Sequence, residues 1–296
     1  MPQITQAALS ILLASIPALM WGYIFYKKDP VYKPKAIATF IIGMLAVLPM
    51  LAYKWSWQYF PQINFFNYTE TMQADVLGFS PLLFLPVGTI LAFMLVGVIE
   101  EYLKHRVVVQ TDRGFFRNID DAIEFSILAA LGFAFIENVL YFYYIWEFQG
   151  TDTVLISFVF RSLFSTFAHV LFSGIYGYFY GIAYFADPIY AEKVREKRHP
   201  LVNLLHRTHF KKNRVFATEK LTEGLLIAVL LHAIFNIFLE MNVTSFMLPF
   251  LVIGYTFLNY LFHKKENLKM YGFLVGEDSP AHVHHIIWEK IGRIQD

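Results

Sequence analysis

The sequence predicts an all-α membrane protein, a bundle of about seven transmembrane helices with the N-terminus outside and the C-terminus in the cytoplasm. Of its 296 residues, 57% are hydrophobic and only 16% are charged, whereas a soluble globular domain carries about 25% charged residues. Apolar runs that are long enough to cross a ~30 Å hydrocarbon core recur along the chain. These runs cover residues 4–26, 36–53, 81–104, 120–146, 154–186, 221–241 and 244–262.

The distribution of positive charge supports this number of spans and sets their orientation. All Lys and Arg residues except Lys54 and Arg161 fall in alternate connections and in the C-terminal tail. Cytoplasmic loops carry the excess of Lys and Arg, so these connections are predicted to face the cytoplasm. The first apolar run lacks a positive leading region, and we therefore interpret it as a retained helix and not as a signal peptide.

Some segments differ from plain spans. The run 154–186 is too long for one straight helix across the bilayer, so we expect an extra turn or an interfacial piece near 153–160. Residues 54–80 mix aromatic and polar side chains, which is typical of an interfacial loop or amphipathic helix. The predicted organisation is an N-terminal part (1–80), a catalytic core (81–241) with a basic cytoplasmic loop (187–219), and a last span with its tail (242–296).

Composition also excludes several functions. The chain has no cysteine, so it has neither a disulfide framework nor a thiol nucleophile. Its net charge of +1 argues against a nucleic acid as partner. The expected surroundings are the lipid bilayer, and we see no internal repeat of the kind that ion-coupled transporters have.

The candidate site consists of the ionisable groups that remain inside the predicted spans once Glu124 and Glu223, in the first turns of their helices, are interpreted as caps or interface residues. Ionisable groups at membrane depth usually face the bundle interior or a water-filled cavity and mark function. The group comprises Glu100, Glu101, Lys104, Glu137, Arg161, His169 and His232. Glu100 and Lys104 share a helix face, as do His232 and Asn236, because residues four apart are neighbours on a helix.

The spacing of these residues predicts that they converge. Glu100 and Glu137 are equally distant from the centre of the hairpin that joins their spans, so they should lie at the same depth. At a rise of 1.5 Å per residue, His169 and His232 both fall in the middle third of the bilayer. A carboxylate pair, a further carboxylate and two imidazoles can therefore meet.

His169 also belongs to a stripe of small residues. Ser173, Gly177 and Gly181 follow it at steps of four, and such ladders let membrane helices approach closely. We expect His169 to lie at a tight helix interface and not against lipid.

One chemistry that fits the cluster uses a divalent metal. Glu137, His169 and His232 would form the two-His-one-carboxylate ligand set of a hydrolytic zinc site. Glu100 or Glu101 would then act as the general base.

The second chemistry needs no metal. A buried glutamate would take the proton from water directly, while His232 and Asn236 stabilise the oxyanion. Lys104 would keep one of the two adjacent carboxylates ionised. A purely structural alternative pairs Glu137 with Arg161.

Four motifs together resemble one family, the PrsW intramembrane proteases. They are Glu-Glu-x-x-Lys at 100–104, the stretch 132–138 ending in Glu137-Asn138 and followed by Tyr141, Arg161 to His169 followed by Gly174 and Gly177, and His232-x-x-x-Asn236. Each motif alone is weak, but the ordered set over residues 81–241 is specific.

The resemblance implies a multi-pass protease of the wider group that includes the CAAX prenyl endopeptidases. Its expected substrate is a membrane-anchored protein such as an anti-sigma factor, and its expected location is the plasma membrane of a prokaryote. By position, Glu100, Glu101, Glu137, His169 and His232 would be catalytic, with Asn236 supporting them. A protease that acts on lipidated peptides and a non-enzymatic scaffold are the alternatives.

Overall fold

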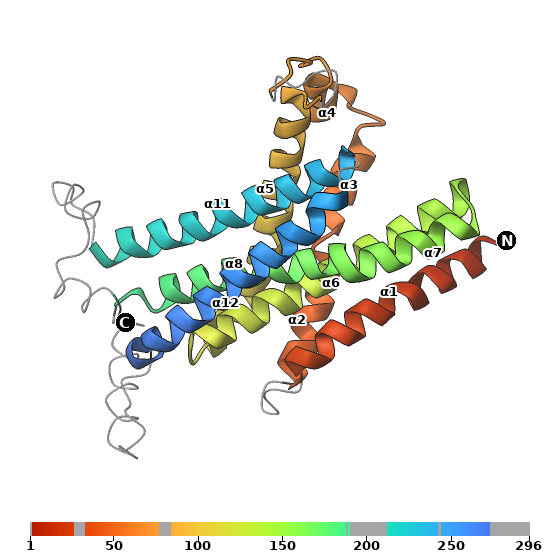
Figure 1. Cartoon of the computed structure of the whole chain (residues 1–296). Coiled ribbons are helices and arrows are strands. Elements are labelled where there is room, and N and C mark those ends of the chain that lie inside the picture. Colours follow the sequence, from red (N-terminus) through yellow and green to blue (C-terminus); the bar gives the residue numbers. More distant parts are fainter. Residues whose placement is uncertain are drawn as a thin grey trace.

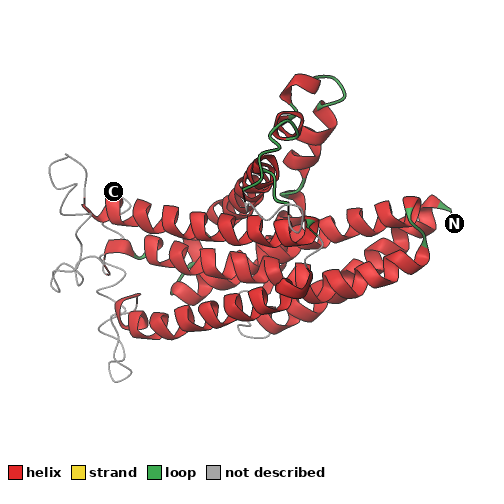
Figure 2. Ribbon diagram, turned by 45° about the horizontal axis from the view of Figure 1, so that its top comes forward, coloured by secondary structure: helices red, strands yellow, loops and turns green. Residues whose placement is uncertain are grey.

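A computed structural model gives the structure of the chain. It describes residues 2–26, 33–76, 84–187, 189, 212–241 and 244–272. Regular structure in these ranges is helical, apart from an isolated bridge between Asp75 and Pro86, which confirms the all-α prediction. Most of the long helices lie side by side in a bundle, which α2 (Lys33–Leu45) and α5 (Val87–Thr111) cross steeply (Figures 1 and 2). Helix α4 (Phe65–Thr69) stands away from the bundle, together with α3 (Leu48–Ser56) and the first turns of α5.

The structure contains long helices and shorter helical pieces. The long ones are α1 (Gln3–Tyr26), α2 (Lys33–Leu45), α5 (Val87–Thr111), α6 (Ile119–Phe148), α8 (Thr166–Tyr184), α11 (Lys212–Glu240) and α12 (Met247–Gly272). The shorter ones are α3 (Leu48–Ser56), η1 (Pro61–Ile63), α4 (Phe65–Thr69), η2 (Arg113–Phe115), α7 (Thr151–Phe160), η3 (Arg161–Ser165) and η5 (Thr244–Phe246).

Within the described ranges, 5 helical segments are long and apolar enough to cross a membrane. They are Gln3–Tyr23, Lys33–Ser56, Ile119–Phe148, Thr151–Tyr184 and Arg214–Glu240. The apolar part of α12, Met247–Leu261, is shorter, and α5 does not belong to this group. A multi-pass membrane protein is thus supported, while the predicted total of seven spans and their orientation stay predictions.

Prolines explain two differences between the predicted and observed helix bounds. The predicted run 36–53 is divided into α2 and α3 by a turn at Ala46 and Val47, and a proline lies at the start of α3. Proline has no N–H to continue the helical hydrogen bonds. Similarly, α5 begins only after Pro86 and continues to Thr111, beyond the predicted limits 81–104.

The predicted long fifth run contains a change of helix type. Helix α7 continues through the π-helical turn η3 into α8, so the region near 153–160 is helical, and its predicted interfacial position stays a prediction. Single π turns inside α-helices are frequent at functional sites. Much of the predicted basic loop 187–219, and the tail from residue 273, lie outside the described residues.

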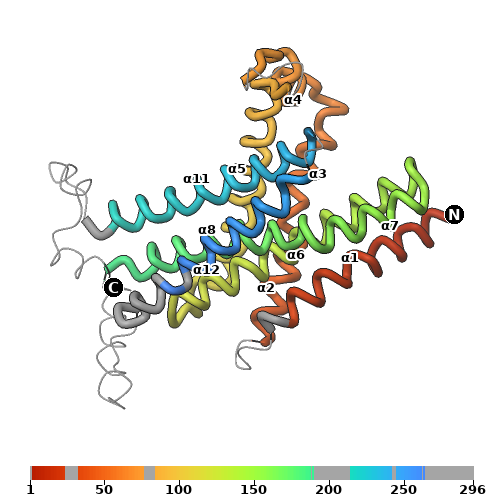
Figure 3. The backbone as a smooth tube through the Cα atoms, in the orientation of Figure 1, coloured from red at the N-terminus to blue at the C-terminus, as the bar shows by residue number. Residues whose placement is uncertain are grey.

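Helix α6 is central to the packing. It contacts α8, α2 and α1, and α1 runs beside its second half (Figure 3). Glycines bring the helices close: a Cβ on Gly132 would lie 2.0 Å from the carbonyl oxygen of Phe40, and a Cβ on Gly177 would lie 2.7 Å from the Cα of Ile123. The predicted close packing of the small-residue stripe is therefore confirmed.

Candidate active site

Four helices bring the predicted polar residues into one buried cluster. Glu100, Glu101 and Lys104 come from α5, and each is at most 6% exposed. His169 on α8 and His232 on α11 are 4% and 3% exposed. Glu137 comes from α6, and its side chain is 36% exposed. The predicted convergence is thus observed.

Glu101 is the organising carboxylate of the cluster. Its Oε1 accepts a hydrogen bond from Lys104 Nζ at 2.8 Å and lies 2.9 Å from His232 Nδ1. Its Oε2 accepts from Ser173 Oγ at 3.5 Å. Because an ionised carboxylate only accepts, His232 donates through Nδ1. The neutral ring then carries a lone pair on Nε2.

Glu100 has different surroundings, although it is adjacent in sequence, because consecutive side chains on a helix are rotated by about 100°. Its Oε2 lies 3.6 Å from His232 Nε2 and 3.7 Å from Lys104 Nζ. This oxygen is buried and accepts no hydrogen bond within the described part of the chain. An unsatisfied buried carboxylate oxygen is costly, so it is an expected place for water or a metal.

His169 links Lys104 to Glu137. Its Nδ1 lies 2.9 Å from Lys104 Nζ, and its Nε2 lies 2.9 Å from Glu137 Oε2. An ammonium group only donates, so Nδ1 accepts and the ring proton is on Nε2. The ring stands edge-on to that of His232, with centroids 5.5 Å apart and an interplanar angle of 86°.

Arg161 holds Glu137 in place. Its Nη2 donates to Glu137 Oε1 at 2.9 Å, and its Nε donates to the Asn138 side chain. Asn138 in turn donates to Thr166 Oγ1 at 3.1 Å, and that hydroxyl donates to the Arg161 carbonyl oxygen across the π turn. The Arg161 guanidinium also lies 4.3 Å from the centroid of the Tyr141 ring. The ion pair that was the structural alternative therefore exists, and the same carboxylate also faces His169.

The chemistry of the donors fits a divalent cation. Ligand atoms of Glu100, Glu137 and His169 all lie within 4.8 Å of one another. Among the residues that the structure describes, none donates a well-aligned hydrogen bond to Oε2 of Glu100 or Oε2 of Glu137, and carboxylate oxygens with imidazole nitrogens are common zinc ligands. By proximity, the third possible ligand is therefore Glu100, whereas the sequence analysis predicted His232 in that place.

His232 remains a suitable ligand for a different reason. Its Nδ1 faces the Glu101 carboxylate, and metal-binding histidines typically donate their second N–H to a carboxylate. Its Nε2 lone pair points towards the same region as Glu100 Oε2. The tautomer therefore favours His232, whereas the Nε2 of His169 would have to release its proton to bind a metal.

Sequence reasoning assigned no role within the candidate site to three residues that support the cluster: Asn138, Thr166 and Ser173. The signals were present, since Asn138 adjoins Glu137 within a motif and Ser173 follows His169 in the small-residue stripe. Asn236 lies one turn after His232, is half-buried, and makes no hydrogen bond with another described side chain. Its predicted supporting role stays a prediction.

Comparison with known proteins identifies what the chain is similar to. The family described as "PrsW family intramembrane metalloprotease" matches residues 33–263. The chain is 30% identical over 252 residues to "Protease PrsW" of Oceanobacillus iheyensis, which covers 83% of this chain and 91% of that protein. It is 29% identical over 168 residues to "Protease PrsW" of Geobacillus kaustophilus, covering 55% and 61% of the two chains. No solved structure matches it significantly.

Proposed function

Because the chain belongs to the PrsW family of intramembrane metalloproteases, we propose that it cleaves a membrane-anchored protein at the cluster of Glu100, Glu137, His169 and His232. The observation that carries this proposal is the buried Oε2 of Glu100, which accepts no hydrogen bond from the described residues and lies 3.6 Å from His232 Nε2. A water molecule bound at this oxygen could transfer a proton to it directly.

In the proposed mechanism, Glu100 is the general base that takes the proton from the attacking water. Glu101 is a positioning residue, since it holds Lys104 and fixes the His232 tautomer. Lys104 places a positive charge between the carboxylates and His169. Arg161 positions Glu137. Burial of these groups excludes bulk water, which strengthens each electrostatic interaction.

We assign the zinc ligands as Glu137, His169 and His232, which leaves Glu100 available as the base. When bound there, zinc would acidify a water molecule and polarise the scissile carbonyl group. Asn236, one turn from His232 on α11, would assist at the oxyanion. These roles rest on donor chemistry and on the contacts of the side chains.

The proposed setting is the plasma membrane of a prokaryote, with seven spans, the N-terminus outside and the C-terminus in the cytoplasm. The concentration of Lys and Arg in alternate connections and in the tail supports this orientation. Residues 81–241 would form the catalytic core, between an N-terminal part (1–80) and a last span with its tail (242–296). The substrate would be a regulatory protein with a membrane anchor, of the anti-sigma-factor kind, as the family resemblance implies.

The test is cleavage of a membrane-anchored reporter protein in reconstituted vesicles. Glu100→Gln and His169→Ala should each abolish cleavage while the protein stays folded, as judged by its thermal unfolding. The matched control is Glu70→Gln, because Glu70 is exposed and lies before α5, outside the cluster. Cleavage at the rate of the unaltered protein by both site variants would refute the proposed site.

A further inference from the structure

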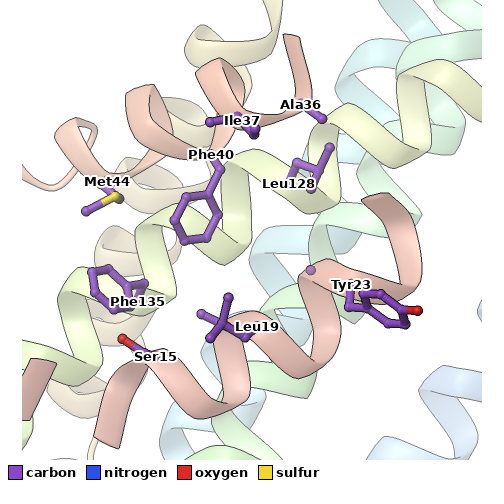
Figure 4. A pocket seen from close by; sticks show the side chains of 11 residues that line it. Ser15, Leu19, Tyr23, Ala36, Ile37, Phe40, Met44, Leu128 and Phe135 are labelled. Carbon is purple, nitrogen blue, oxygen red and sulfur yellow. The ribbon is translucent and has the colours of Figure 1, made fainter. Parts of the chain in front are cut away.

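An apolar groove lies between α1, α2 and α6, away from the polar cluster. Its volume is about 470 Å³, which is within the range of small-molecule sites. Figure 4 shows the side chains of all three helices converging on it. The lining residues are Ser15, Ala18, Leu19, Gly22, Tyr23, Ala36, Ile37, Phe40, Met44, Leu128 and Phe135.

The groove and the candidate active site lie on different sides of α6. Phe135 lines the groove and packs against Phe40, with ring centroids 6.1 Å apart. Phe133 instead packs against His169, at 6.1 Å between centroids, and Glu137 also faces the cluster. Residues two positions apart on a helix point about 160° away from each other. The groove is therefore not part of the site for peptide cleavage.

The groove opens to the outside between two candidate membrane spans. Leu19 of α1 and Ile37 of α2 line it and are 71% and 49% exposed. In a bilayer this opening faces lipid tails. Ser15 to Tyr23 and Ala36 to Met44 each cover eight helical steps, so the groove is about 12 Å long. Its narrow apolar form suits a flexible hydrocarbon chain, and leaving such a space empty would forfeit packing energy.

Charge at one end of the groove indicates the chemistry of the headgroup. Lys33 is the first residue of α2. It precedes Ala36 by three positions and Ile37 by four, so it lies one turn further along the face of α2 that lines the groove. Lys35, on a neighbouring face of α2, lies 4.4 Å from the centroid of the Phe115 ring and adds positive charge at the same end of the helix. Lysines at a membrane surface attract anionic lipid headgroups.

We propose that the groove binds one acyl chain of an anionic glycerophospholipid, whose phosphate lies at Lys33. The bound lipid would fill the space between α1, α2 and α6 and stabilise the packing of the first two helices on the central one. This site is independent of the catalytic cluster.

The test is native mass spectrometry of the whole protein with a mixture of phosphatidylglycerol and phosphatidylcholine that carry identical chains. One phosphatidylglycerol should remain bound to the unaltered protein. Gly22→Phe should remove it, because a Cβ at Gly22 meets no atom within 4 Å and the ring would fill the groove. Leu12→Phe is the matched control, since Leu12 lies on α1 outside the groove and is 60% exposed.

A second pair of variants tests the headgroup. Lys33→Glu should lower the preference for phosphatidylglycerol over phosphatidylcholine by about fivefold or more, since one basic residue near the surface contributes about 1 kcal/mol. Lys54→Glu, at the exposed end of α3, should leave the preference unchanged. An unchanged preference in Lys33→Glu would contradict the proposed phosphate position.

Photolabelling of the unaltered protein keeps the proposal testable if a variant fails to fold. Phosphatidylglycerol with a diazirine at the chain end should label peptides that contain Leu19, Phe40 or Phe135. Labelling spread evenly over all lipid-facing helices, retention of the lipid by Gly22→Phe, or crosslinking of the groove to a substrate helix in place of lipid would each overturn it.

Discussion

Two adjacent glutamates, Glu100 and Glu101, have different neighbours. Oε1 of Glu101 accepts from Lys104 and contacts His232, and its Oε2 accepts from Ser173, so both oxygens are engaged. Glu100 keeps one buried oxygen that accepts no hydrogen bond from the part of the chain that the structure describes. Enzymes commonly separate the roles of two nearby carboxylates through their surroundings. We therefore assign proton transfer to Glu100 and orientation to Glu101.

The first prediction separates a base from a metal ligand at Glu100. Glu100→Gln should lower the cleavage rate by about 10²–10⁴-fold, the usual contribution of a general base, but it should keep bound zinc. His169→Ala and His232→Ala should lose zinc. Elemental analysis of the purified proteins measures this, with Glu70→Gln as the control. Loss of zinc from Glu100→Gln would make Glu100 a ligand, and full zinc in both histidine variants would contradict the ligand assignment.

Sequence predicts which residues meet, but not how they pair. Helix rise and rotation determine depth and face, so the convergence of Glu100, Glu137, His169 and His232 follows from their spacing. The partner of each oxygen depends on side-chain rotamers and on how α5 crosses α8 and α11. For this reason the Glu101–His232 contact, like the hydrogen bond from Arg161 to Asn138, was not predictable.

At the scale of elements, the helix crossings at α6 set the position of the site. The α2–α6 contact is close because Gly132 and Gly43 let backbones meet: an added Cβ would lie 2.0 Å from Phe40 O and 2.3 Å from Ala129 O, respectively. On its other side, α6 receives Gly177 of α8. The predicted small-residue stripe identified the α8 contact. No pattern identified the α2 contact, because its glycines are single and not spaced at four.

The second prediction concerns this α2–α6 crossing. Gly132→Ala should destabilise the protein by about 1–3 kcal/mol, the usual cost of overpacking, because the new Cβ meets backbone that cannot move aside. Thermal unfolding in detergent measures the effect. Gly114→Ala is the control, since a Cβ at Gly114 meets no atom within 4 Å. An unfolding midpoint equal to that of the control would show that α2 and α6 are further apart.

At the scale of the whole molecule, the topology depends on whether α5 crosses the membrane. By length and composition it is not one of the candidate spans among the described helices, because Glu100, Glu101 and Lys104 interrupt its apolar sequence. Those three side chains are nonetheless buried. Lys104 and Glu101 pair with each other, and they contact His169 of α8 and His232 of α11, respectively. Charges that pair inside a bundle do not face lipid. Hydropathy along the sequence therefore underestimates the ability of α5 to cross a membrane, and we predict that α5 spans the bilayer.

Cysteine labelling tests this third prediction directly, because the natural chain contains no cysteine. Gln62 in η1 and Arg113 in η2 are both exposed and lie beyond the two ends of α5. In intact cells a membrane-impermeant maleimide should react with Gln62→Cys, whereas Arg113→Cys should react only after the membrane is broken. Gln149→Cys, between α6 and α7, should behave as Gln62→Cys does. If Gln62→Cys and Arg113→Cys react alike, α5 does not cross, and its charged cluster would be reached by water from one face without any passage through the bilayer.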